Sequence, residues 1–282
     1  MKPSACRHAT EVGDRHKAAA AAVMRYPCAM DYPTTPDADH QAGSSDIDGW
    51  LETPLGQCLV DSEKTELEER VAQFFGFELL QIGDWGALQS VRAKALTRNA
   101  VLVSAKVSSG VQIVSEASHL AIASDTIDGV ILPHTLEFDE EPHRVLREAE
   151  RILSGEGKLA ILGFNPYSFW GARRLFGTRR FLPGVKHMLS RRRICDWLTL
   201  LGFELTETRN FFYRLPINNQ RVLDGSAVCE RVGARLGGFM SGVYLIMAKK
   251  RVYSAVPPRL ARRSKKAAVV GGLVKPTSRN RS

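Results

Sequence analysis

The sequence predicts a doubly wound α/β domain with a mostly parallel sheet of seven strands. Two observations lead to this fold class. Strand-like and helix-like segments alternate between residues 77 and 250, the pattern of βαβ units and a parallel sheet. Most of the strand-like segments are continuous apolar runs, which is typical of strands covered by helices on both faces. In such sheets, ligands bind beyond the carboxyl ends of the strands, where the strand order reverses.

Seven segments have the composition of strands. They are residues 77–83, 100–105, 111–115, 128–132, 158–164, 203–209 and 242–250. The carboxyl edge of this sheet would consist of four loops, at residues 83–86, 104–106, 133–138 and 164–170.

Four helices are expected between these strands. Asp61 or Ser62 is expected to cap the first, which ends at Gly76. The others are residues 87–96, 140–153 with Pro142 in the first turn, and 190–202 between a Ser190 cap and Gly202. The third helix carries an apolar stripe, and residues 154–157 are expected to form a turn into the next strand.

The positive charge of the chain is concentrated at its C-terminal end. Of 39 basic residues, 11 lie between Lys249 and Ser282, where no acidic residue occurs, so the rest carries 28 basic and 30 acidic residues. We therefore predict a disordered extension at residues 1–45, a folded domain at 46–250 and a basic, disordered tail at 251–282. The tail is either simply solvated or makes weak contact with nucleic acid or an anionic surface.

Cysteine usage and hydropathy indicate a cytoplasmic protein. The five cysteines are scattered, without a C-x-x-C pair or a histidine at metal-binding spacing, so we expect neither a disulfide framework nor a metal site. No apolar run approaches the roughly 20 residues that a membrane-spanning helix needs.

Residues 122–166 carry the most specific pattern in the chain. Acidic residues at Asp125 and Asp128 precede the apolar strand, a His134–Glu137 segment follows it, and a helix and a glycine-containing turn lead to the next strand. This succession resembles the class I S-adenosylmethionine (SAM)-dependent methyltransferases of the type 11 kind. The resemblance covers about residues 50–250 and implies a Rossmann-like methyltransferase fold with an antiparallel last strand.

The resemblance implies a SAM site at the carboxyl edge. The residues expected there are Ile82, Gly83, Asp84, Gly86, Ser104, Glu116, Leu132 and Pro133. Two positions depart from the family's usual pattern. Gln81 replaces an acidic residue before a glycine loop in which only Gly83 matches, and Ser104 lies where a ribose-binding carboxylate is usual.

The acceptor side is expected around His134 and the segment 164–193. His134 is a candidate general base, since imidazole titrates near neutrality; alternatively, it shapes the cofactor pocket. Glu137, Tyr167, Trp170 and Arg173 are candidate acceptor-binding residues, because aromatic rings can stack on a planar acceptor and arginines can hold an anion. The alternative is a mobile lid with solvated arginines.

Two functions from different classes remain open at the level of sequence. The first is a SAM-dependent methyltransferase that acts on an unidentified acceptor. The second is a non-catalytic module of the same fold that binds RNA or a protein partner, which the departures at Gln81 and Ser104 favour. A P-loop nucleotidase and an NAD-type oxidoreductase are disfavoured because the chain lacks both glycine fingerprints.

Overall fold

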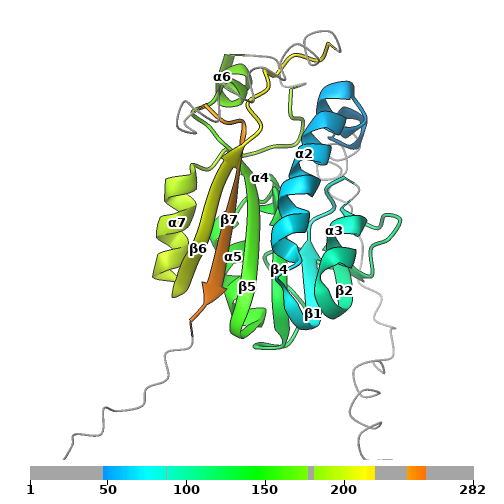
Figure 1. The fold of residues 1–282 in the computed structure, drawn as a ribbon, viewed down its shortest axis with the longest axis vertical. Helices are drawn as coiled ribbons and strands as arrows, with labels where there is room; N and C mark the ends of the chain where they lie inside the picture. The colour runs from blue at the N-terminus through cyan, green and yellow to red at the C-terminus, as the bar shows by residue number, and fades with distance from the viewer. Residues whose placement is uncertain (1–46, 87, 177–180, 220–239, 252–282) are drawn as a thin grey trace, which may run out of the picture. The chain divides into compact units, whose positions relative to one another are not determined.

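The computed structural model describes residues 47–86, 88–176, 181–219 and 240–251 (Figure 1). The expected N-terminal extension and all of the basic tail except Arg251 lie outside these residues, as do Ala87, Arg179 and Arg180. The domain boundaries expected at residues 45 and 251 therefore stay predictions.

The predicted fold class is confirmed. A seven-stranded sheet has the order β3-β2-β1-β4-β5-β7-β6. β7 is antiparallel to β5 and β6, whereas the other ladders are parallel. The strands are β1 (Phe75–Ile82), β2 (Leu96–Ser104), β3 (Ile113–Val114), β4 (Ile127–Pro133), β5 (Leu153–Phe164), β6 (Phe203–Phe211) and β7 (Val243–Lys250).

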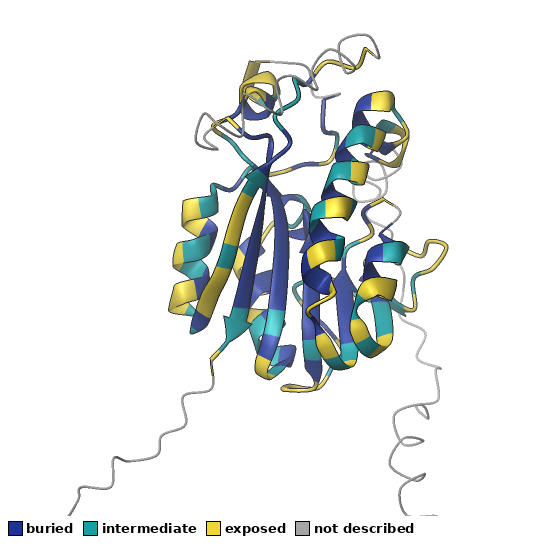
Figure 2. Ribbon diagram, viewed as in Figure 1, coloured by how far each residue is buried: buried dark blue, intermediate teal, exposed yellow. Residues whose placement is uncertain are grey.

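Helices cover both faces of the sheet. They are α2 (Pro54–Val71), α3 (Gln89–Lys94), α4 (Thr135–Phe138), α5 (Pro142–Ile152), α6 (Phe169–Phe176) and α7 (Arg191–Leu200). One apolar core joins α2 and α3 to one face, and the other joins α5 and α7 to the opposite face. The central strands are consequently buried along most of their length (Figure 2). α4 and α6 lie at the end where the parallel strands stop (Figure 1).

α2, the first of the helices expected from the sequence, begins earlier than predicted. Thr53 is its N-cap, with Oγ1 accepting a hydrogen bond from the Gly56 amide at 3.2 Å, and Pro54 occupies the first turn. This pairing of cap and proline is a strong start signal. Ser62 instead lies mid-helix, where its hydroxyl donates to the Cys58 carbonyl at 2.9 Å. The helix ends at Val71 and not at Gly76 as the sequence predicted. Gly76 belongs to β1.

The prediction of a turn at residues 154–157 is wrong, because these residues lie within β5. β5 already begins at Leu153, which pairs with Ile127, whereas Lys158 pairs with Gly129. The register shift between these two pairs is a β-bulge, in which extra residues on one strand oppose fewer on its partner. The cap expected at Ser190 and the position of Pro142 in the first turn of its helix are confirmed.

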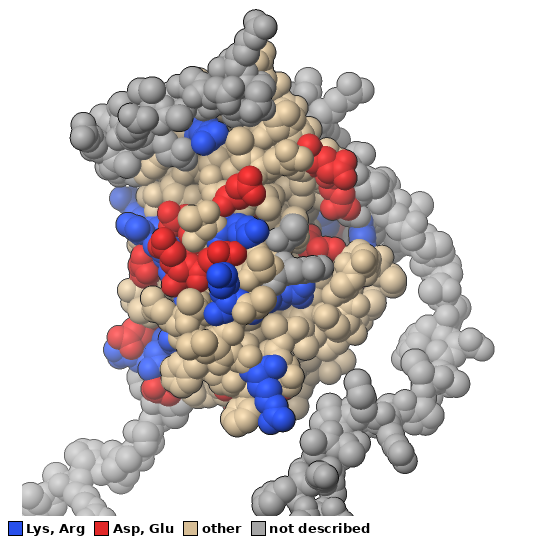
Figure 3. All heavy atoms as spheres, turned by 45° about the vertical axis from the view of Figure 1, so that its right-hand side comes forward, with Lys and Arg blue, Asp and Glu red and all other residues tan. Residues whose placement is uncertain are grey.

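The described surface carries charges of both signs. Figure 3 shows lysines and arginines interspersed with acidic side chains on the face that it presents. No helix in the described part of the chain combines the length and the apolar character that crossing a bilayer requires.

Candidate functional site

The strand order reverses between β1 and β4. The chain proceeds from β1 to β2 and β3 on one side, then returns to place β4 on the other side of β1. In an open α/β sheet this reversal opens a crevice at the carboxyl ends of the strands. The segments after β1, β2 and β4 therefore border the position expected for a ligand.

Gly83 forms the turn that ends β1. Its amide donates to the Val103 carbonyl at 2.8 Å, and its φ of 100° is one that glycine adopts without strain. A Cβ at this position would lie 2.7 Å from Oγ1 of Thr135. Thr135 itself donates from that oxygen to the Ile82 carbonyl. The glycine thus allows α4 to approach the end of β1 closely.

Beside this turn, a buried hydrogen-bonded cluster joins Glu63, Trp85, His134 and Glu137. Glu63 accepts from the Trp85 indole at 2.7 Å through Oε2, and its Oε1 lies 2.8 Å from Nε2 of His134. Nδ1 of His134 lies 2.7 Å from Oε2 of Glu137. The other oxygen of Glu137 accepts from the Phe164 amide at 2.5 Å. The cluster therefore connects α2, the β1 loop, the end of β4 and the end of β5.

The cluster holds a charged imidazole. Burial opposes the charge on His134, but the two carboxylates outweigh it and raise the pKa of His134 to about 9. Burial raises the pKa of Glu137, an effect that the histidine and the Phe164 amide oppose. At neutral pH both nitrogens of His134 accordingly donate to the glutamates.

Aromatic rings enclose His134 as well. The centroid of its ring lies 4.4 Å from that of Trp85 and 4.1 Å from that of Phe164. The side chain is 0% exposed. His134 is also the N-cap of α4 and has a left-handed φ of 55°, a strained conformation that the surrounding contacts maintain.

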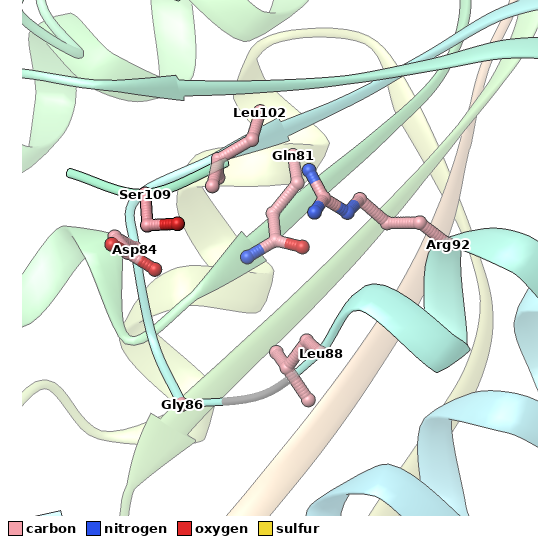
Figure 4. A pocket seen from close by; sticks show the side chains of 7 residues that line it. All are labelled: Gln81, Asp84, Gly86, Leu88, Arg92, Leu102 and Ser109. Carbon is pink, nitrogen blue, oxygen red and sulfur yellow. The ribbon is translucent and has the colours of Figure 1, made fainter. Parts of the chain in front are cut away.

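A pocket lies between the β1 loop and the loop that follows β2. Its volume is about 210 Å³, and it is lined by Gln81, Asp84, Gly86, Leu88, Arg92, Leu102 and Ser109 (Figure 4). Gln81 and Arg92 are 2% and 8% exposed. Oε1 of Gln81 and Nη1 of Arg92 are buried without a hydrogen-bond partner among the described residues. Such unpaired buried groups are uncommon in folded proteins and call for an explanation.

Comparison with known proteins identifies the family. A family model described as a methyltransferase domain matches residues 84–161. The chain is 37% identical over 205 residues to the uncharacterized protein YafS of Escherichia coli, and this match covers 72% of the chain and 81% of YafS. The chain is therefore a methyltransferase-domain protein of the same family as YafS.

The chain is also similar to solved structures, of which the first named here supports its fold. A SAM-dependent methyltransferase from Archaeoglobus fulgidus is 19% identical with a TM-score of 0.50, over 67% of this chain and 94% of that one. A structure from Thermotoga maritima, described as a possible histamine N-methyltransferase, is 15% identical with a TM-score of 0.48, over 74% and 95% of the two chains. Similarity at this level of identity concerns the fold.

The residues expected to bind the cofactor lie along the carboxyl edge. Asp84 and Gly86 line the pocket. Ile82, Leu132 and Pro133 are buried at the ends of their strands. Ser104 ends β2, where Oγ accepts from the Lys106 amide at 3.3 Å. Glu116 is exposed and pairs with His119 at 3.7 Å, so the structure does not place it at the pocket lining.

The residues expected to bind the acceptor divide into buried and exposed members. Glu137 and Trp170 are 1% exposed, whereas Tyr167 is 65% exposed. Arg173 is exposed, with its guanidinium 4.9 Å from the centroid of Phe181 and donating to the Pro216 carbonyl. In this conformation Tyr167 and Arg173 lie at the surface, whereas Glu137 and Trp170 are buried.

Sequence reasoning missed Glu63 and Arg92. Glu63 interrupts an apolar stripe of α2, four residues from both Leu59 and Leu67, which are buried. A carboxylate on the inner face of a helix needs a partner, and this signal could have identified it. Arg92 lies next to the buried Val91, so a basic residue in the apolar part of the short helix was the corresponding signal.

Proposed function

We propose that this methyltransferase binds SAM at the carboxyl ends of β1, β2 and β4 and transfers the methyl group to an acceptor. The observation that supports this most directly is the pocket between the β1 loop and the loop after β2, where polar atoms of Gln81 and Arg92 have no hydrogen-bond partner among the described residues. Such atoms are the groups that a polar ligand satisfies. The match of a methyltransferase-domain model to residues 84–161 supports the same function.

The residues present fit part of the cofactor. The polar atoms of Gln81, Asp84 and Arg92 offer both donors and acceptors. The pocket volume of about 210 Å³ is below the range of roughly 300–1,000 Å³ usual for small-molecule sites. The pocket in this conformation therefore accommodates a portion of SAM.

SAM supplies a reactive methyl group on a positively charged sulfur, so the protein mainly has to position the reactants. The buried cluster would fix the β1 loop against α2 and β4, holding Gly83 and Asp84 in place. The role of His134 as a general base stays a prediction, and it requires the cluster to open, because both ring nitrogens are occupied and the ring is buried. We propose instead that His134 is a positioning residue.

The acceptor would approach from the side of α6. Tyr167 and Arg173 are the exposed members of the expected acceptor set and lie in the segment after β5. An aromatic ring and a guanidinium together suit a planar or anionic acceptor. Both side chains already contact other residues, so binding would exchange existing contacts for new ones.

Two observations favour a second candidate function, a non-catalytic module that binds RNA or a protein. Trp85 is 2% exposed within the glycine loop, and Ser104 stands at the end of β2 in place of a carboxylate. Contact with nucleic acid and a cytoplasmic location both stay predictions.

Thermal unfolding of the full-length protein with SAM, S-adenosylhomocysteine and NAD tests the proposed function. A ligand at 100 times its dissociation constant stabilises a protein by about 2.7 kcal/mol. For a domain of this size this corresponds to roughly 5–10 °C. We expect a shift with the two adenosyl sulfur compounds and none with NAD. The absence of a shift with either sulfur compound would favour the binding module.

A further inference from the structure

The guanidinium of Arg92 lies at the pocket between the β1 and β2 loops without a partner for Nη1 among the described residues. Arg92 is 8% exposed and belongs to α3. Leaving a buried cation without hydrogen bonds is costly in a medium of low polarity. Its neighbours in the pocket include Leu88 and Leu102, which offer it no acceptor side chain.

Gln81 presents the opposite polarity to the same pocket. Its Nε2 donates to the Gly83 carbonyl at 3.0 Å, and its Oε1 has no donor in the part of the chain that the structure describes. Figure 4 shows both side chains directed into the space between the two loops. A ligand that satisfied both would carry an acceptor for Arg92 and an N–H or O–H donor for Gln81.

Charge around the pocket decides which acceptor suits Arg92. Asp84 also lines the pocket, but it is exposed, and its Oδ2 accepts from the Ser108 hydroxyl at 2.5 Å. Burial lowers the pKa of Arg92, and the attraction of Asp84 opposes this effect. A guanidinium can only donate, and its fork of N–H groups matches the oxygens of a carboxylate or a phosphate.

The end of β2 lacks the group that usually receives ribose hydroxyls. In Rossmann-type sheets a carboxylate near this position binds the hydroxyls, whereas an arginine accommodates a phosphorylated ribose. Here β2 ends in Ser104, and the positive charge is that of Arg92 on α3, the helix that precedes β2. The pocket is thus better suited to an anionic group than to a neutral sugar edge.

We propose that this pocket binds the anionic oxygen group of a ligand, a carboxylate or a phosphate, on the guanidinium of Arg92, with Oε1 of Gln81 accepting from the same ligand. The inference deepens the proposed function, on which it rests for the adenosyl nature of the ligand. Cofactor recognition would then depend on an ionic contact made by α3.

Calorimetric titration of the full-length protein with four adenosine compounds distinguishes the two anions. S-adenosylhomocysteine carries a carboxylate that 5′-methylthioadenosine lacks, and AMP carries a phosphate that adenosine lacks. In at least one pair, we expect the compound that carries the carboxylate or phosphate to bind ten-fold or more tightly than the compound that lacks it. The pair that differs identifies the group as a carboxylate or a phosphate.

Variants then assign the preference to Arg92. Arg92→Met should reduce the affinity for the anionic compound at least ten-fold and leave the neutral compound within two-fold, and Arg92→Lys should restore part of the loss. Arg98→Met is the matched control, because Arg98 is an exposed arginine on β2. Without ligand, Arg92→Met should unfold at the same or a higher temperature, because it removes a buried charge whose Nη1 has no hydrogen-bond partner among the described residues.

Two results with the adenosine compounds would overturn the proposal. One is an equal affinity for the anionic and neutral members of both pairs, and the other is a preference that Arg92→Met leaves unchanged. Titration with inorganic phosphate and acetate covers a protein that binds no adenosine compound. In that case the proposed function fails, and binding of either anion that Arg92→Met removes would still support the anion pocket. No Arg92-dependent binding of any probe would overturn it.

Discussion

The indole nitrogen of Trp85 donates a 2.7 Å hydrogen bond to Oε2 of Glu63, joining the loop after β1 to the helix that precedes it by 22 residues. Both side chains are buried. Glu63 also binds His134, so the position of the loop after β1 depends on α2.

Trp85→Phe is expected to destabilise the protein by about 1–3 kcal/mol, because the variant leaves a buried carboxylate oxygen without a donor. The midpoint of urea unfolding measures this change. Trp197→Phe is the control, since Trp197 is only partly buried and makes no side-chain hydrogen bond within the described residues. Equal effects of the two substitutions would show that the bond to Glu63 contributes nothing specific.

The stability of the protein is expected to fall as the pH rises from about 6.5 to about 9. The pKa of His134 is raised to about 9 from an unfolded value near 6.5. Its stabilising contribution is therefore complete below pH 6.5 and is lost as the pH rises through 9, a difference of about 3 kcal/mol. The raised pKa of Glu137 acts with the same sign. Urea unfolding at a series of pH values measures the slope.

Two variants assign this slope to His134. His134→Gln should remove most of it, at the cost of lower stability at neutral pH. Glu63→Gln keeps the imidazole but removes one of the carboxylates that raise its pKa, so the fall should be smaller and should end at a lower pH. A wild-type slope that both variants preserve would show that the cluster does not hold the proton.

Gly83→Ala is expected to lower stability by more than about 1 kcal/mol, because the added Cβ meets Oγ1 of Thr135 at 2.7 Å and because alanine is strained at a φ of 100°. It should also weaken SAM binding, which calorimetry would measure. Gly49→Ala is the matched control, since a Cβ there has nothing within 4 Å. A Gly83→Ala protein with wild-type stability and affinity would exclude Gly83 from both roles.

Removal of residues 252–282 is expected to leave SAM affinity within about two-fold. All the described residues of the pocket and the buried cluster lie between Glu63 and Phe164. The same truncation removes most of the excess positive charge, so binding to RNA at low salt should weaken if the tail makes that contact. A large loss of SAM affinity would show that the tail supports the folded domain.

The elements with strong local signals could be predicted from the sequence. The apolar runs identified the strands, Ser190 identified the start of α7, and Pro142 identified the start of α5. The start of α2 was missed because Asp61 and Ser62 are also good caps, although Thr53 and Pro54 precede them. The bulge in β5 was missed because glycine and serine favour turns, and only pairing with β4 shows that the strand continues.

The candidate site divides in the same way. The sequence by itself determined the fold class and the turn at Gly83, because periodicity and backbone freedom are local properties. Only the tertiary structure decided that His134 meets Glu63 across 71 residues of chain, and that Arg92 and Gln81 face one pocket. The physical reason is that burial and charge pairing depend on which segments pack together, and side chains far apart in the sequence become partners only after the sheet has formed.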